Sequence, residues 1–322
     1  AIGKKAKSLI LLSGTPVLSR PVELWNALTL MDDTVWYNYW DFCRRYCGAH
    51  QTRWGLEVKG ATNLDELQQR ISRYFLRRKK EDVLKDLPDK VFIDVPVEMD
   101  SQSRSEYNVA EKEFAKYLRD YKNKRHTEIT KAMTAEKLTK INFLRQISVA
   151  GKIKSAIELI ESIVDSGNKV LVFSSFNEPL EKLRATFPNS VMITGKTAVS
   201  ERGQIVKKFQ EDPDTKIFFG GMVSAGVGIT LTAASFVVLL DFPWNPADTA
   251  DAWARAHRPG AEYESLSIYQ MISVGTIDEF MKKLLVKKQK IFDQLIDGGK
   301  SEEDASIDEF VDEMIKMYGH EF

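Results

Sequence analysis

The stretch Val170-Leu171-Val172-Phe173-Ser174 decides the fold class, because it is a short, almost continuously apolar run between two helical patterns. A strand buried on both faces has this character, whereas a strand with one solvated face alternates apolar and polar residues. Helical spacing of apolar residues precedes the run over 152–165 and follows it over 178–186. The run therefore predicts a central strand in a sheet that helices cover on both faces.

Strands and helices go on alternating beyond this run. We expect helices at 199–211 and about 247–256, and strands at 190–194, 215–219, 236–240 and 265–272. This order is typical of a doubly wound parallel sheet, because each helix returns the chain to the same end of the sheet. Residues 151–275 are therefore predicted to form one complete α/β domain.

The segments outside this domain follow other patterns. Residues 1–100 are mainly helical in spacing, apart from expected strands at Ser8–Leu12 and Val91–Val97. Two long charged helices are expected over 101–150, and a helix over 276–296 precedes an acidic tail that ends at 322. Residues 8–100 offer too few strands for a sheet of their own. We therefore interpret them as an incomplete part of another domain, and the chain as a fragment.

Composition excludes few functions. The chain has 46 basic and 46 acidic residues, so its net charge indicates no particular partner. No apolar run approaches the length of a membrane span, and we expect no membrane association. The two cysteines, Cys43 and Cys47, provide no disulfide framework and favour a reducing compartment.

Cys43 and Cys47 are also candidate metal ligands. They are four residues apart and would share one helix face, with His50 one turn further on. Three such ligands could begin a zinc site, but no fourth Cys or His follows nearby. Aromatic residues surround the two thiols, and a free cysteine behaves as a small apolar residue. We therefore favour packing in an apolar core and predict no metal site.

Two stretches resemble nucleotide-binding motifs, and each departs from its motif at one position. Gly195-Lys196-Thr197 looks like the end of a P-loop, but Ser190 stands where the first glycine should be and begins a predicted strand. Asp241 ends a strand as a magnesium-binding Asp would, but Phe242 follows it in place of Glu. Because no other segment supplies these functions, the chain alone is predicted not to hydrolyse ATP.

The stretch from Gly220 to Gly260 carries the strongest functional signal. Gly226 and Gly228 follow a predicted strand and allow the backbone to approach a ligand closely. Arg255 and Arg258 are expected on one helix face near the carboxyl edge of the sheet, where ligands of such folds bind. An arginine pair there could stabilise a transferring phosphoryl group. The alternative is a surface helix with arginine–carboxylate pairs.

An ordered series of motifs resembles the Swi/Snf-type family of helicase-like DNA translocases, and within it the annealing-helicase branch of HepA-related proteins. The resemblance spans roughly residues 8–296. It is carried by Leu11–Pro16 (motif III), Leu76–Val83 with Leu87-Pro88, Val170–Ser174 (motif IV), Gly195-Lys196-Thr197 with Glu201-Arg202, Gly226–Leu231 (motif V) and Arg255–Gly260 (motif VI). Ser19–Leu24 and the segment from Tyr46 to Gly55 resemble the annealing-helicase branch in particular.

This resemblance implies that 151–275 is the second RecA-like lobe of a motor. Residues 1–100 would then be a remainder of lobe 1 with a helical insertion, 101–150 protrusion and linker helices, and 276–322 a brace helix with an acidic tail. The implied activity is DNA-stimulated ATP hydrolysis that drives translocation, remodelling or annealing on intracellular DNA. The implied partners are double-stranded or forked DNA and the chain's own N-terminal lobe, which would hold most of the ATP and Mg²⁺.

The resemblance also assigns roles to single residues. Arg255 and Arg258 would act on the γ-phosphate as catalytic residues, beside a cofactor-binding wall of Gly226 and Gly228. The implied DNA contacts are Ser174, Lys196, Thr197, Arg202, Thr230 and Trp244, and the residues that couple ATP to DNA are Ser13, Gly14 and Thr15. For Trp244 a buried anchor for the motif VI helix is an equally good interpretation.

Motif VI departs from the family pattern Q-A-x-D-R-x-H-R-I-G-Q. Asp251 and Ala254 stand at its two leading polar positions, and Ala261 stands at its last one. The first two replacements are expected to weaken hydrogen bonding around the nucleotide. A non-hydrolytic DNA- or protein-binding module with a relic ATPase lobe is therefore the alternative function. An RNA helicase lobe is disfavoured, because such lobes lack the Leu76–Pro88 signature and the long protrusion helices.

Overall fold

The computed structural model describes residues 6, 8–14, 16–17, 20–52, 55–58, 60–124, 131–224 and 228–297. These residues divide into two compact units. Of the described residues, the first unit holds those up to Val83 with Asn245–Ala247 and 283–297, and the second holds Leu84–Trp244 and Asp248–Lys282. Within the described part of the chain, no helix combines the length and the apolar character needed to cross a bilayer.

The first unit is mainly helical. Its elements are a 3₁₀ turn Pro21–Leu24, α1 Trp25–Met31, α2 Tyr39–Tyr46, the antiparallel pair β1 His50–Thr52 and β2 Gly55–Glu57, α3 Leu64–Ile71, a 3₁₀ turn Ser72–Tyr74 and α4 Lys80–Val83. Asn38 caps α2, because its side-chain oxygen accepts hydrogen bonds from the next backbone N–H groups. Cys43 and Cys47 are both fully buried among aromatic residues in this unit's core, as the sequence predicted.

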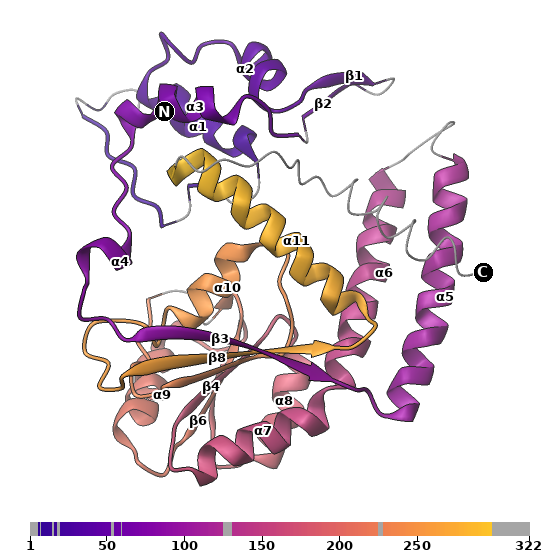
Figure 1. Ribbon diagram of the computed structural model, residues 1–322, viewed down its shortest axis with the longest axis vertical. Coiled ribbons are helices and arrows are strands. Elements are labelled where there is room, and N and C mark those ends of the chain that lie inside the picture. The colour runs from indigo at the N-terminus through magenta and orange to yellow at the C-terminus, as the bar shows by residue number, and fades with distance from the viewer. Residues whose placement is uncertain are drawn as a thin grey trace. The chain divides into compact units, whose positions relative to one another are not determined.

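The second unit is built on a six-stranded parallel sheet in the order β3-β8-β7-β4-β6-β5 (Figure 1). The strands are β3 Asp89–Val97, β4 Val170–Ser174, β5 Val191–Ile193, β6 Ile217–Gly221, β7 Phe236–Leu239 and β8 Ser265–Ser273. Every residue of β4 is buried, which confirms that the apolar run at 170–174 is a central strand. The doubly wound α/β fold predicted from the sequence is therefore confirmed.

Helices cover both faces of this sheet. One face packs on α9 Val199–Glu211 and α10 Pro246–Trp253, through residues such as Phe209 and Ala252. The other face packs on α7 Ile153–Asp165 and α8 Asn177–Thr186, through residues such as Ile160 and Leu183. This arrangement explains why the central strands read as unbroken apolar runs, since neither face is solvated.

Two long helices precede the sheet's central strands, as predicted: α5 Ser101–Lys124 and α6 Lys131–Ala150. They pack side by side (Figure 1). Arg104 of α5 donates to the carbonyl oxygens of Val274 (2.6 Å) and Gly275 (3.3 Å), so this helix is tied to the end of β8. The chain then enters α11 Ile277–Phe292, which continues into a π-helical turn at Asp293–Asp297.

The structure differs from the sequence prediction at the two N-terminal strands. Ser8–Leu12 does not form the predicted strand, and Ile10 and Leu12 are 82% and 92% exposed. A strand needs a neighbour for its backbone hydrogen bonds, and the described strands of the first unit, β1 and β2, pair with each other.

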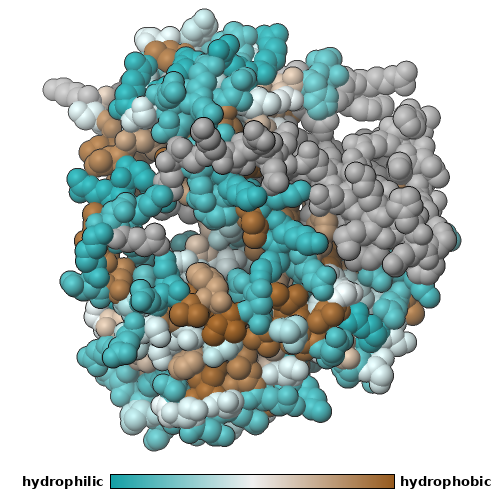
Figure 2. All heavy atoms as spheres, in the orientation of Figure 1, coloured by the Kyte–Doolittle hydropathy of each residue, from teal (hydrophilic) through white to brown (hydrophobic). Residues whose placement is uncertain are grey.

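The strand expected at 91–97 does form, as β3, but it belongs to the second unit. It pairs in parallel with β8 along its whole length, from Asp89 opposite Ser265 to Val97 opposite Ser273. Because β3 is an edge strand, part of its apolar surface is open: Val91 and Phe92 are 45% and 51% exposed. Apolar side chains gather over β3 and β8 in the space-filling view (Figure 2).

Candidate nucleotide and DNA site

The two arginines of motif VI lie in a turn and not on a helix. We expected Arg255 and Arg258 on one helix face, but α10 ends at Trp253 and both follow it. Pro259 disfavours helical backbone at the residue before it, and Gly260 has a φ of +90°, so the chain turns here.

This arginine turn lies toward the amino ends of β3 and β8, not at the carboxyl edge where we predicted it. The Nε2 atom of His257 is 2.8 Å from the carbonyl oxygen of Pro88, the residue directly before β3. The reason is topological: α10 has to return the chain from the carboxyl end of β7 to the amino end of the parallel strand β8. His257 is 2% exposed, and its contact with Pro88 was not foreseen from the sequence.

The arginine turn is tied to the loop that follows β6. The Nη1 atom of Arg258 donates to the hydroxyl of Thr230 at 2.7 Å, and the backbone N–H of Leu231 donates to the carbonyl of Arg255 at 2.9 Å. Sequence reasoning gave Arg258 a nucleotide role and Thr230 a DNA role. The structure joins the two side chains in one contact.

Arg255 is a buried cation without a carboxylate at hydrogen-bonding distance among the described residues. Its side chain is 7% exposed, and its Nε atom has no hydrogen-bond partner there. Burial, and then the charge of Arg258, lower the pKa of the Arg255 guanidinium, while Asp251 opposes them. A buried charge is costly unless an opposite charge compensates it. The site is therefore suited to accept an anion.

The glycine loop beside this turn is only partly described. Gly228 has a φ of +73°, a conformation that favours glycine, and a Cβ atom there would meet no atom of the described residues within 4 Å. Gly226, the other predicted cofactor-binding glycine, lies outside the described residues.

A second group of candidates lies at the carboxyl edge of the sheet, in the loop between β5 and α9. The guanidinium of Arg202 donates to the carbonyl oxygens of Thr197 (3.3 Å) and Ser224 (3.0 Å), and so joins this loop to the one after β6. The hydroxyl of Thr197 accepts the backbone N–H of Thr194 at 3.0 Å. Both side chains brace the loop. Lys196 points into solvent, 75% exposed and 3.3 Å from Glu181.

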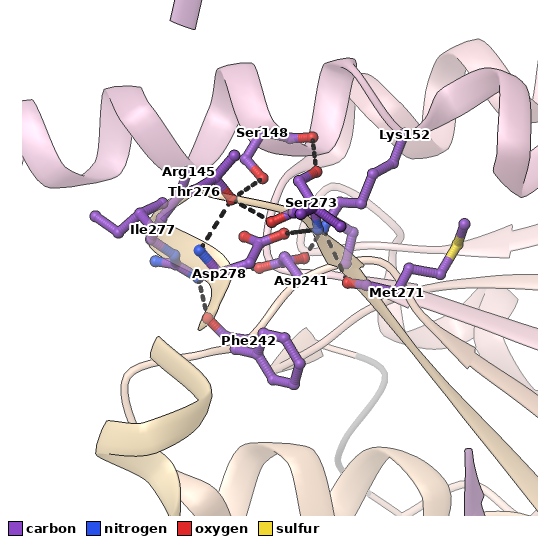
Figure 3. A network of polar contacts seen from close by, with 12 residues as sticks. Arg145, Ser148, Lys152, Asp241, Phe242, Met271, Ser273, Thr276, Ile277 and Asp278 are labelled. Carbon is purple, nitrogen blue, oxygen red and sulfur yellow. Dashed lines mark hydrogen bonds and ion pairs between the residues drawn. The ribbon is translucent and has the colours of Figure 1, made fainter. Parts of the chain in front are cut away.

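Ser174 is not available for DNA, which corrects its predicted role. It is fully buried at the end of β4, and its hydroxyl donates to Oδ1 of Asp241 at 2.8 Å. The structure reveals a polar network here that sequence reasoning missed (Figure 3). Arg145 of α6 forms an ion pair with the carboxylate of Asp241 at 3.0 Å.

Trp244 is half-buried in the loop after β7. Its ring centroid is 5.6 Å from the guanidinium carbon of Arg145. The ring therefore packs against a side chain of α6, and its remaining exposed surface leaves a DNA contact as a prediction.

The coupling residues predicted from motif III lie in the first unit. Ser13 and Gly14 are exposed, and the carbonyl of Gly14 accepts a hydrogen bond from Nη1 of Arg77 at 3.4 Å. This contact joins two of the motifs that carry the family resemblance. Thr15 lies outside the described residues.

Comparisons with known proteins agree with this arrangement. Residues 3–151 match the SNF2-related domain, and residues 151–260 match the helicase conserved C-terminal domain. The human "DNA annealing helicase and endonuclease ZRANB3" is 33% identical over 93% of this chain. The Xenopus tropicalis "SWI/SNF-related matrix-associated actin-dependent regulator of chromatin subfamily A-like protein 1" is 31% identical over 95% of it. The chain spans 28% and 32% of the lengths of these two relatives.

Solved structures show the same fold. The "Sulfolobus solfataricus SWI2/SNF2 ATPase core in complex with dsDNA" aligns with a TM-score of 0.52 and 25% identity, over 86% of this chain and 60% of that one. The C-terminal part of the Fun30 ATPase domain aligns with a TM-score of 0.56 and 20% identity, over 72% of this chain and 99% of that one. On the family matches, the motifs and the fold together, the chain belongs to the SNF2-related family of helicase-like ATPases.

Proposed function

We propose that this chain supplies the second RecA-like lobe of a DNA-stimulated ATPase that moves on, remodels or anneals duplex DNA. The observation that carries the proposal is Arg255, a buried cation held next to Arg258 and lacking a carboxylate partner among the described residues. Such a pair is suited to the charge that develops on a transferring phosphoryl group.

In this proposal the arginine turn acts on a nucleotide whose phosphates are held by a P-loop outside these 322 residues. The described residues contain no group of three carboxylate, His or Cys side chains that could hold a metal, and Asp241 is paired with Arg145. Mg²⁺ and the phosphates would therefore be bound by the first lobe. The contact of Arg258 with Thr230 sets the direction of its guanidinium, and the contact of His257 with Pro88 fixes the turn.

Duplex DNA is proposed to bind at the carboxyl edge of the sheet, where Lys196 is exposed and the loops after β5 and β6 are joined by Arg202. The relative named as an ATPase core in complex with dsDNA supports a duplex as the ligand. Contacts to phosphates are sequence-independent and weaken with salt. Lys196→Ala is therefore expected to weaken binding to every duplex and to lower the salt slope by about 1.

The test is ATP turnover with and without duplex DNA, measured on this chain alone and on the protein that also contains the P-loop lobe. We expect turnover only in the longer protein, and stimulation by DNA. There, Arg255→Ala should lower kcat by about 10³-fold or more, since arginine fingers contribute effects of that order. The control is Arg184→Ala, an exposed arginine in the last turn of α8, which should leave kcat unchanged.

Asp251 and Ala254 favour a second candidate, a DNA- or protein-binding module with a relic ATPase lobe. It would be supported if the longer protein bound duplex DNA but did not hydrolyse ATP. Equal kcat values for Arg255→Ala and the wild type would contradict the role given to the arginine turn.

A further inference from the structure

The Arg145–Asp241 ion pair joins three separate elements inside the second unit. Arg145 belongs to α6, and Asp241 follows β7. The Nη2 atom of Arg145 donates to Oδ2 of Asp241 at 3.0 Å, to the carbonyl of Phe242 at 2.6 Å and to the hydroxyl of Ser175 at 3.2 Å. The two side chains are only 4% and 1% exposed, so the pair is isolated from solvent.

The carboxylate of Asp241 holds the ends of two neighbouring strands together. Its Oδ1 atom accepts both the hydroxyl of Ser174 and the backbone N–H of Ser175, each at 2.8 Å. Ser174 is the last residue of β4, and β4 pairs directly with β7. A single carboxylate therefore fixes where the chain leaves both strands, at the carboxyl edge that we assign to DNA.

Arg145 also supports the aromatic side chains that follow these strands. Its guanidinium carbon lies 5.6 Å from the ring centroid of Trp244 and 5.1 Å from that of Phe176. A guanidinium stacks on aromatic rings and forms hydrogen bonds in its plane at the same time. Arg145 thus contacts the Asp241 carboxylate, the Phe242 carbonyl and the Trp244 ring together.

A buried ion pair contributes little net stability, because desolvation offsets the attraction, and in some proteins its role is to specify the geometry of its surroundings. We propose that the Arg145–Asp241 pair is a positioning device for the DNA-binding edge: it holds Trp244 and the Ser175 turn in place and thereby sets DNA affinity from α6, without contacting DNA or nucleotide itself. This proposal rests on the proposed function only for its DNA readout.

The molecule contains a matched control. Lys152, at the start of α7, pairs with Asp278 at 2.5 Å, and these side chains are 0% and 2% exposed. The ammonium group also donates to the carbonyl of Met271, and Asp278 accepts the backbone N–H of Ser273 at 3.0 Å (Figure 3). This pair joins the end of β8 to α11, whereas the first pair joins the ends of β4 and β7 to α6.

The test compares two double variants in which a buried ion pair is replaced by neutral side chains. The first variant carries Arg145→Met and Asp241→Asn together, and the second carries Lys152→Met and Asp278→Asn together. In each, the Asn side chain keeps an oxygen to accept the backbone N–H, so the strand ends retain that hydrogen bond. The first readout is ¹⁹F NMR of protein labelled with 5-fluorotryptophan, whose six tryptophans give one resonance each, with Trp244 assigned by Trp244→Phe. We expect the Trp244 resonance to move in the first variant and to stay in place in the second.

The second readout is duplex DNA affinity, measured by fluorescence anisotropy on the same proteins. The first variant should bind about fivefold to tenfold more weakly, the effect of freeing one aromatic side chain from a cation–π contact. The second variant should bind within about twofold of wild type, since it leaves Arg145 in place. A similar loss of affinity in both variants, or a loss that only follows their melting temperatures, would overturn the proposal.

The two readouts separate this inference from the proposed function. If wild type does not bind duplex DNA, the proposed function fails, and the ¹⁹F resonance still decides whether Arg145 positions Trp244. If wild type binds DNA and the Trp244 resonance does not move in the first variant, the positioning role is wrong and the proposed function stands.

Discussion

Replacing Lys152 by Met tests the energetics of the buried ion pairs most directly. The substitution removes the ammonium group 2.5 Å from Asp278 and leaves that carboxylate 2% exposed without its cation. Breaking a buried pair in this way costs about 3–5 kcal/mol, because an uncompensated charge remains inside the protein. At about 2–4 °C per kcal/mol for a unit of this size, Tm should fall by about 6–20 °C.

The double replacement Lys152→Met with Asp278→Asn should be more stable than the single one. It leaves no buried charge, and the amide oxygen can still accept the N–H of Ser273. We expect it to recover at least about 2 kcal/mol of the loss, since a neutral amide is much less costly to bury than a carboxylate. We therefore expect the wild type to be the most stable protein, the double variant to be less stable, and Lys152→Met to be the least stable.

The assay is urea unfolding followed by circular dichroism and tryptophan fluorescence, with the m-value as a check that the transition is comparable. The control is Lys182→Met, which breaks an exposed pair with Glu178 at 2.8 Å and should cost less than about 1 kcal/mol. A loss below about 1 kcal/mol for Lys152→Met, or a double variant no more stable than the single one, would refute this reasoning.

Three further predictions concern other parts of the molecule. Gly228→Ala should lower the free energy of unfolding in urea by about 1–2 kcal/mol, and Gly228→Asn by less, because the backbone has positive φ while no described residue crowds a Cβ atom there. Hydrogen bonds, first from Tyr74, lower the pKa of Asp32 from 3.8 to about 2, so Tyr74→Phe should raise it in an NMR titration. The stability from this carboxylate is present above pH 3.8 and is lost as the pH falls through about 2. Cys43 and Cys47 should resist a thiol reagent until the protein is unfolded, because both are buried and burial raises the pKa of Cys47.

The strands of the second unit could be predicted from the sequence, because a strand that is buried on both faces consists almost entirely of apolar residues. Val170–Ser174 is uninterrupted by charge, and helical spacing brackets it. Ser8–Leu12 has nearly the same apolar character but is not a strand here. An apolar run shows that a segment could be buried in a sheet. It does not show whether the fold provides a neighbouring strand for that segment to pair with.

The site was predicted in part, for a similar reason. The motifs named Arg258 and Thr230 separately, for nucleotide and for DNA, and did not predict the 2.7 Å hydrogen bond that joins them. The hydrogen bond between Ser174 and Asp241 could not be foreseen, because Asp241 follows a different strand, β7, and which strands lie side by side depends on the order of the sheet. Local signals did exist for the turn at Arg258: the Pro-Gly that follows it predicts the end of a helix.

The pairing of β3 with β8 has a consequence for synthesis of the chain. The first strand of the sheet, β3, pairs with the last one, β8. During synthesis β3 therefore leaves the ribosome long before residues 265–273 have been made and can pair with it. Such long-range pairing is slow to form and leaves a strand edge exposed during elongation. The nascent second unit can close its sheet only when β8 arrives. Truncation of the chain before Ser265 would leave β3 without its pairing strand. We expect such a protein to aggregate through β3, which carries the exposed side chains of Val91 and Phe92.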